Sequence, residues 1–383
     1  MQPKAARNIP IEALRLVAVA GIAVFHTFQW TFQAVCTGLP EYAPLAAFPY
    51  SGALGFINLL GCWANEVFFM TSGYFLIASA ARAWDGGATW KSQMQRTAQR
   101  LGKVVMPTAF YCLVALAWST VVSPIPDVTL NTHYWYTLGL EFIWVYAATV
   151  FMAPWFGLAK SRLSQKSYTT TVIAVGILAF VVNGYLAAMS TTSAGEFSWL
   201  QKLMSAATYV IAFLIGGLLR DVTDAMDSDR AGALGMRSLA AVLALATILE
   251  GALSFTDNLT AMTILSYKST SLISFALAAA SLLFAATRRS ASGNPRTAGV
   301  IVTLSTATLG FYVMQSLTSS LWRPVFNTLL ANILVSQNSP AAICIVTGTV
   351  ISIVFALALL IIDAVEALSL ASSSGNRHAA VRP

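Results

Sequence analysis

The sequence predicts an all-α fold: a polytopic membrane helix bundle of about ten transmembrane helices with both termini in the cytoplasm. Three observations predict it: the high apolar content, the grouping of apolar residues into long blocks, and the placement of Lys and Arg between the blocks. Hydrophobic residues make up 57% of the 383-residue chain and charged residues only 10%, whereas soluble proteins carry about 25% charged residues. A soluble fold of this size could not cover its surface with so few charges.

The apolar blocks are long enough to cross a bilayer, which requires about 20 mostly apolar residues in a helix. Segments containing Gly, Pro, Ser or Asp separate several of the blocks. We expect one transmembrane domain over residues 1–370 and a disordered cytoplasmic tail over residues 371–383. The ten blocks lie at about residues 11–34, 52–80, 101–122, 133–159, 169–189, 200–219, 232–254, 260–287, 298–322 and 340–369.

The distribution of Lys and Arg sets the orientation, because these residues are enriched in short cytoplasmic loops. With the N-terminus inside, 18 of the 22 Lys and Arg residues fall in cytoplasmic segments. Arg15 lies within the first helix, and Lys202, Lys268 and Arg323 lie near outer helix ends. We therefore expect a multi-pass protein of the cytoplasmic membrane.

The formal net charge of +7 does not indicate a nucleic-acid partner, because the positive charges lie in short segments between apolar blocks and form no basic domain. The first block has no A-x-A cleavage site after it and is interpreted as a retained helix. The four cysteines are scattered without CxxC spacing and are expected to be free thiols, with no metal site. They are Cys36, Cys62, Cys112 and Cys344.

Ionisable side chains inside the apolar blocks are the informative ones, since each costs about 2.5–3.5 kcal/mol at a helix centre on insertion scales. Such residues usually face the bundle interior and mark a pathway or a site. Glu250, Asp363 and Glu366 lie nearer helix ends, where pairing or reaching toward water is expected. The more deeply placed residues are Arg15, His26, Glu66, Glu141 and Lys268.

Arg15 and His26 are eleven residues apart in the first block. That spacing is close to three helical turns, so both side chains share one face and are separated by roughly 16 Å along the axis. One of them could hold an anionic donor while the other acts on an acceptor. The alternative is that Arg15 reaches lipid phosphate and His26 hydrogen-bonds a neighbouring helix.

Two later blocks carry carboxylates beside other notable residues. Glu66 precedes Ser72 and Gly73, small residues that also favour close helix packing in lipid. Glu141 follows a group of aromatic residues and a histidine that is also typical of an outer interface. That group is His133, Trp135 and Tyr136.

Arg96, Arg100 and Lys103 follow the spacing i, i+4, i+7 before the third block, so they line one helical face. Attraction to anionic lipid explains such a face. A clamp for the phosphates of a cytosolic cofactor such as coenzyme A explains it as well.

These residues also resemble the motifs of acyltransferase family 3. That family has an Arg and a His separated by ten residues in its first helix, as Arg15 and His26 are here. Glu12 stands where Asp is common, and Gln315 stands where many members carry His. The segments that carry the resemblance are 11–18 with 24–26, 68–74, Arg96 with Arg100 and Pro107, 133–136 with Glu141 and Tyr146, and 310–315.

The resemblance implies a membrane-bound acyltransferase, of the class that transfers groups other than amino-acyl groups. It implies transfer of an acyl group, commonly acetyl from acetyl-CoA, to a hydroxyl of an envelope polysaccharide, a lipid-linked saccharide or another glycoside. The sequence leaves open another acyl group such as succinyl, and transfer to N instead of O. It also leaves open the side of the membrane, the acceptor and the oligomeric state.

Acyl transfer to an alcohol needs a base for the hydroxyl proton and a donor for the developing oxyanion. We expect His26 to be the base, Glu141 or Glu66 to fix its tautomer, and Arg15 to hold the donor phosphates or polarise the thioester. A covalent route through His26 or Ser72 stays open. The expected donor-binding residues are Arg15, Ser72, Arg96, Arg100 and Lys103, and the expected acceptor-binding residues are His133, Trp135 and Tyr136.

A proton-coupled secondary transporter is the alternative, because ten helices with buried charges fit that function too. Two inverted halves with matched helix breaks would favour it. The sequence shows no such repeat.

Overall fold

The computed structural model describes residues 7–126, 128–129, 140–190, 198–267, 270–288, 294–336 and 340–379. Within these ranges the regular structure is helical and no strand is present, which confirms the all-α prediction. The helices are α1 (Ile9–Cys36), η1 (Pro40–Tyr42), α2 (Ala43–Ala46), α3 (Tyr50–Asp85), α4 (Trp90–Val121), α5 (Glu141–Arg162), α6 (Gln165–Ser190), α7 (Ser198–Ala225), α8 (Ser228–Phe255), α9 (Leu259–Leu265), α10 (Leu272–Thr287), α11 (Pro295–Thr306), α12 (Thr308–Leu317), α13 (Ser319–Ser336) and α14 (Pro340–Ala379).

The number of spanning helices is lower than the ten expected. Among the described residues, eight helices are long and apolar enough to cross a membrane, and α11 with α12 forms a ninth span if this bent pair counts as one. The block expected at about 260–287 is divided, because α9 ends at Leu265 and α10 has only 16 residues. The block at 298–322 is likewise divided between α11, α12 and the start of α13.

The bend between α11 and α12 is 43°. It is the one such break found among the described spanning helices. Matched breaks in two halves, which would favour a transporter, are therefore not found in that part of the chain.

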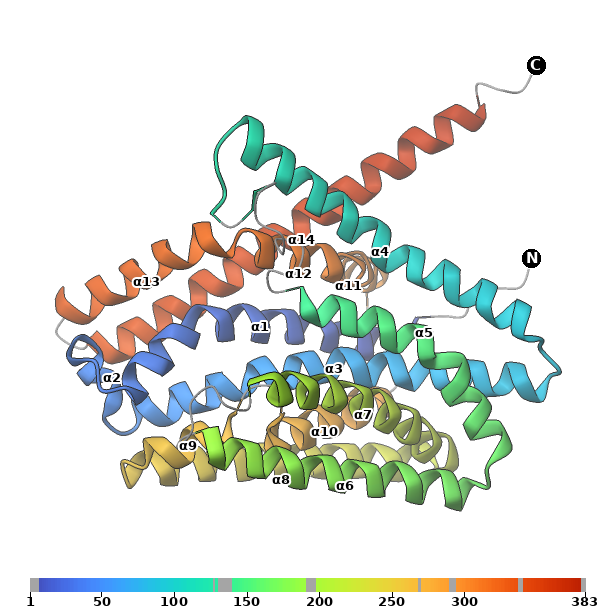
Figure 1. Cartoon of the computed structure of the whole chain (residues 1–383), viewed down its shortest axis with the longest axis horizontal. Coiled ribbons are helices and arrows are strands. Elements are labelled where there is room, and N and C mark those ends of the chain that lie inside the picture. The colour runs from blue at the N-terminus through green and yellow to red at the C-terminus, as the bar shows by residue number, and fades with distance from the viewer. Residues whose placement is uncertain are drawn as a thin grey trace.

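Helix α3 lies at the centre of the bundle and contacts α1, α5, α7, α8 and α10 (Figure 1). Glycines permit its closest approaches. A Cβ atom on Gly73 would overlap the backbone carbonyl of Phe213, and one on Gly216 would overlap that of Met70. Because lipid supplies no hydrophobic force between helices, such close backbone packing is a main source of their association.

The first residues of α1 and the last of α14 lie at the same end of the bundle (Figure 1). The distribution of Lys and Arg predicts that this end faces the cytoplasm, and on that prediction we call it the cytoplasmic end. Helix α14 continues to Ala379, past residue 370, where we expected the membrane domain to end. Helix α4 begins at Trp90, so Arg96 and Arg100 lie within a continuous helix and not in a loop before it.

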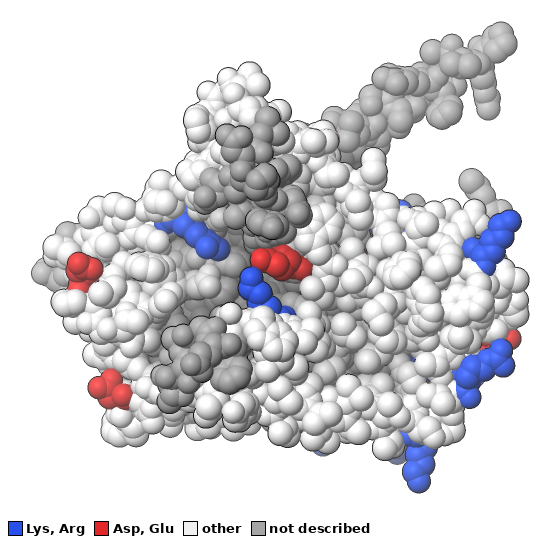
Figure 2. All heavy atoms as spheres, in the orientation of Figure 1, with Lys and Arg blue, Asp and Glu red and all other residues white. Residues whose placement is uncertain are grey.

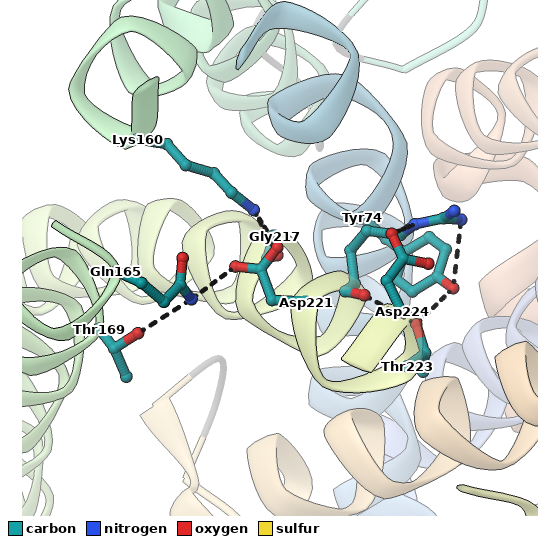
Figure 3. A network of polar contacts seen from close by, with 9 residues as sticks. Tyr74, Lys160, Gln165, Thr169, Gly217, Asp221, Thr223 and Asp224 are labelled. Atoms are coloured by element: carbon teal, nitrogen blue, oxygen red, sulfur yellow. Dashed lines mark hydrogen bonds and ion pairs between the residues drawn. The ribbon is translucent and has the colours of Figure 1, made fainter. Parts of the chain in front are cut away.

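A polar network joins α5, α6 and α7 at the cytoplasmic end (Figure 3). Lys160 pairs with Asp221, which also accepts a hydrogen bond of 3.0 Å from Gln165. Lys160 also donates to the carbonyl of Gly217 at 3.3 Å. The cation is thus held by acceptors on a neighbouring helix, and the contacts fix the ends of three helices together.

Candidate active site

A pocket of about 500 Å³ opens between α1, α3, α4, α5, α11 and α12 near the cytoplasmic end. Three cationic side chains line it: Arg7 and Arg15 beside α1, and Lys103 on α4. Glu12 is the one acidic residue in the lining. We call this site the cation pocket.

Local sequence explains how α1 presents these charges. Asn8 caps the helix by accepting a hydrogen bond of 3.2 Å from the backbone N–H of Ile11, and Pro10 lies in the first turn, where a missing N–H costs nothing. This start places Glu12 and Arg15 within the first two turns, on the side that faces α4.

Glu12 holds the two arginines in place. Its carboxylate lies 3.2 Å from Arg15 and 3.9 Å from Arg7. Among the described residues, the Nε–H of Arg15 is nevertheless buried without a hydrogen-bond partner. An unpaired buried donor costs about 1–3 kcal/mol, so an anion entering the pocket would find a donor already in position.

The inner wall of the cation pocket is formed by hydroxyl-bearing and aromatic side chains. Ser72 on α3 is 5% exposed, and its hydroxyl lies 2.9 Å from that of Tyr146 on α5. Phe142 and Tyr312 complete this wall, with ring centroids 4.6 Å apart. The pocket therefore leads from charged groups at its mouth to a largely apolar end.

Beyond this wall the aromatic side chains continue into the bundle. Phe69 stacks on Tyr209 with centroids 4.6 Å apart and planes 3° apart, and it contacts Phe142 edge-on. Offset and edge-to-face aromatic pairs contribute about 0.5–1.5 kcal/mol each beyond burial. We call Phe69, Phe142, Tyr146, Tyr209 and Tyr312 the aromatic layer; it closes the apolar end of the cation pocket.

His26 lies farther along α1, and its partner differs from the one expected. The Nη2 group of Arg323 on α13 lies 3.1 Å from Nδ1 of His26. A guanidinium only donates hydrogen bonds, so Nδ1 accepts and the neutral ring carries its proton on Nε2. The expectation that Glu141 or Glu66 fixes the tautomer of His26 is therefore wrong for this arrangement.

The two carboxylates lie elsewhere. Glu66 is fully buried, and neither of its oxygens has a hydrogen-bond partner among the described residues. Glu141 is the first residue of α5, after the cap residue Leu140, and is exposed. Glu141 does lie close enough to Tyr312 to act on it electrostatically, as does Arg323.

The other predicted residues divide into three groups. Ser72 and Lys103 line the cation pocket together with Arg15. Arg96 and Arg100 are not part of its lining, although they lie on the same helix as Lys103. His133, Trp135 and Tyr136 lie outside the residues that the structure describes, as does Lys268.

Sequence reasoning missed Arg323 as a site residue. It was assigned to an outer helix end, as one cation among several, and it lies 297 positions from His26. A signal was present, because the preceding residue is a tryptophan and the Arg323 guanidinium lies 5.5 Å from the centre of that ring. Nothing in the spacing, however, connects α13 with α1.

The remaining carboxylates near the end of α14 behave as structural groups. The Tyr111 hydroxyl on α4 hydrogen-bonds Asp363, and it lies 2.8 Å from a carboxylate oxygen of Glu366. The pairing expected for these two residues is therefore present, whereas Glu250 is buried and neither of its oxygens has a hydrogen-bond partner among the described residues. All four cysteines are free, as expected.

The fold and the site define a multi-pass helical membrane protein with a cation-lined pocket at one end and a half-buried imidazole beyond it. The chain belongs to acyltransferase family 3: the family model described as an acyltransferase domain matches residues 8–359. The protein is therefore an acyltransferase of this family, as the motifs in the first four blocks predicted. Searches of curated proteins and of solved structures each found no match.

Proposed function

We propose that the protein moves an acetyl group from acetyl-CoA to a hydroxyl of a carbohydrate in the cell envelope, as a multi-pass enzyme of the cytoplasmic membrane. The acceptor is an envelope polysaccharide, a lipid-linked saccharide or another glycoside. The observation that carries this proposal is the cation pocket, which joins a cluster of positive charge to a hydroxyl-lined, apolar end.

The pocket fits a nucleotide thioester in two ways. Arg7, Arg15 and Lys103 supply the positive charge that phosphates need, and an arginine fork can bind phosphate oxygens in pairs. The Nε–H of Arg15 is a donor that no described residue of the protein uses. The apolar end beside Ser72 suits the uncharged arm that carries the thioester.

The reaction has a simple balance. The hydroxyl oxygen of the acceptor attacks the thioester carbonyl, a C–O bond forms, the C–S bond breaks, and the hydroxyl proton ends on the released thiolate. The protein must stabilise negative charge on the carbonyl oxygen and transfer that proton.

In this proposal, His26 and Arg323 stabilise the negative charge that develops on the carbonyl oxygen. With Nδ1 occupied by Arg323 and Gln29 hydrogen-bonded to the same ring, the imidazole donates its Nε2–H to an oxyanion when Gln29 releases it. A base role for His26 requires Arg323 to release Nδ1, since only that nitrogen holds a lone pair. We assign proton acceptance to Glu141, whose charge acts on Tyr312 at the end of the cation pocket.

The test is acyl transfer by membranes from cells expressing the protein. Membranes are incubated with acetyl-CoA that is radiolabelled in its acetyl group, and label in the saccharide fraction is counted. His26→Ala should abolish incorporation while the protein stays inserted at wild-type abundance. If that variant incorporates as much label as the wild type, His26 is not part of the mechanism. Uptake of an intact solute without acetylation would favour the transporter alternative.

A further inference from the structure

Resting on the function proposed above, we infer that a second, smaller pocket in the outer half of the bundle binds the acceptor as one sugar residue that carries an acidic group. This outer pocket lies between α1, α3 and α7 and has a volume of about 240 Å³. Pockets for drug-sized ligands measure roughly 300–1,000 Å³. The outer pocket therefore takes a smaller group, of the size of a single pyranose ring.

The lining of the outer pocket suits hydroxyl groups. Each of the three helices contributes residues four positions apart, so one face of each helix borders the space. Amides and hydroxyls both donate and accept hydrogen bonds, as sugar hydroxyls do. The polar lining residues are Gln29 on α1, Asn65 on α3, and Gln201, Lys202 and Ser205 on α7.

Asn65 has an unused acceptor. Its Nδ2 donates to the Tyr209 hydroxyl at 3.1 Å, whereas its Oδ1 is buried and has no partner in the described part of the chain. Leaving such an atom unpaired costs about 1–3 kcal/mol. A ligand hydroxyl that donates to Oδ1 removes this cost, which favours a polyhydroxylated ligand over an apolar one.

Lys202 gives the pocket its charge preference. Its side chain is exposed at the pocket, and no ion pair involves it in the described part of the chain. The described lining contains no acidic residue. A lysine offers three donors as a compact positive charge, so a carboxylate or phosphate on the sugar would complete the site.

The outer pocket lies next to His26. The neighbouring Phe25 borders the pocket, and its ring centre is 5.0 Å from that of His26. Gln29, also in the lining, hydrogen-bonds the His26 side chain. A Cβ atom on Gly61 would overlap the Phe25 ring, so this glycine lets the aromatic face lie flat against α3.

The cation pocket and the outer pocket lie in sequence along α3. Asn65 and Ser72 are seven residues apart, or roughly 10 Å along the helix, and Phe69 of the aromatic layer lies between them. On the face shown in Figure 2, the surface is hollowed beside the outer half of α1, with basic and acidic side chains at its edge. The aromatic layer thus separates an acceptor in the outer pocket from a thioester in the cation pocket.

Binding of two matched probes tests this inference without requiring the natural acceptor. Saturation-transfer NMR on the full-length protein in nanodiscs compares methyl β-D-glucuronide with methyl β-D-glucoside. The wild type should bind the glucuronide about fivefold more tightly, the effect of one exposed charge pair of about 1 kcal/mol. In Lys202→Met this preference should vanish, while Lys166→Met, a lysine at the cytoplasmic start of α6, should retain it.

A second pair of variants tests the position of the site. Ser205→Phe fills the pocket and should abolish binding of both probes, whereas Thr171→Phe, on the exposed face of α6, should not. The inference is overturned if the wild type binds neither probe, if it binds both equally, or if Lys202→Met keeps the preference. Thermal stabilisation by coenzyme A reports the donor site separately. If coenzyme A binds and neither saccharide does, only this inference is contradicted. If a saccharide binds and coenzyme A does not, the proposed function is contradicted.

Discussion

Arg323 on α13 lies 3.1 Å from Nδ1 of His26 on α1, and this contact joins two helices at opposite ends of the sequence. Arg323 is also partly buried, and its own Nε–H has no partner in the described structure. A buried cation next to an imidazole, instead of the carboxylate usual for a general base, is a feature that the mechanism must explain.

Replacing Arg323 tests the assignment of His26 as an oxyanion donor. Arg323→Met leaves Nδ1 without its donor, so the imidazole can adopt either tautomer. We expect the rate of acetyl transfer at saturating substrate to fall by roughly 10²-fold, the effect of losing one preorganised donor. Arg323→Lys, which keeps a donor, should fall less.

A double-mutant cycle separates this role from a structural one. If Arg323 acts through His26, the loss in the His26→Ala/Arg323→Met double variant should be close to that of His26→Ala alone. Additive losses would show that Arg323 acts independently. Circular dichroism and size-exclusion profiles of the purified variants check that folding is unchanged.

Replacing Lys103 tests whether the cation pocket binds acetyl-CoA. Lys103→Met removes one of its three cations, and a hydrogen bond to a charged group contributes about 1.5–3 kcal/mol. We expect the KM for acetyl-CoA to rise about 10-fold or more, with little change in kcat. Lys91→Met, on the exposed first turn of the same helix, is the matched control and should stay within twofold of wild type; equal behaviour of the two variants would contradict the pocket assignment.

The class of protein and half of the site follow from sequence alone, because both depend on local patterns. Block length and charge placement predict a polytopic bundle, and the spacing of Arg15 and His26 predicts their shared helix face. The breaks at Ala307 and after Leu265 were not predicted, although each lies in a polar stretch: residues 266–271 are Ser-Tyr-Lys-Ser-Thr-Ser, and Ala307 lies among Ser305, Thr306 and Thr308. A criterion of about 20 mostly apolar residues averages over such short polar stretches, so it joins helices that the fold separates.

The site contacts that the sequence did not predict depend on which helices pack together. Arg323 reaches His26, and Asn65 reaches Tyr209, across separations of 297 and 144 residues. Without homologous sequences to reveal paired changes, such contacts leave no trace in a single chain. Glu66 was selected as a partner for His26 because both lie within apolar blocks, and depth alone does not determine which way a side chain points.

Close packing of α3 against α7 gives a stability prediction. Gly73→Ala places a methyl group against the backbone of Phe213, which cannot move aside as a flexible side chain could. Forcing extra atoms into a packed core typically costs 1–3 kcal/mol. We expect a clear drop in the melting temperature measured by intrinsic fluorescence in detergent.

The matched control for that variant lies on α6. A Cβ on Gly184 would meet nothing within 4 Å, so Gly184→Ala should leave the melting temperature unchanged or raise it, as expected for alanine in a helix interior. A similar loss in both variants would mean that the contact between α3 and α7 is not the cause.

Ser72 decides between direct transfer and a covalent intermediate. The hydroxyl that Ser72 contacts belongs to Tyr146, at 2.9 Å, and an activated serine requires a base as its hydrogen-bond partner. A tyrosine hydroxyl is a poor base at neutral pH, so this geometry favours a positioning role.

Ser72→Ala should therefore keep transfer within about tenfold of wild type, the range of one lost neutral hydrogen bond. Tyr146→Phe should cause a similar loss. Intact-protein mass spectrometry after brief exposure to acetyl-CoA provides the decisive reading: an acetyl adduct on wild type that disappears in Ser72→Ala would establish the covalent route and contradict the direct one.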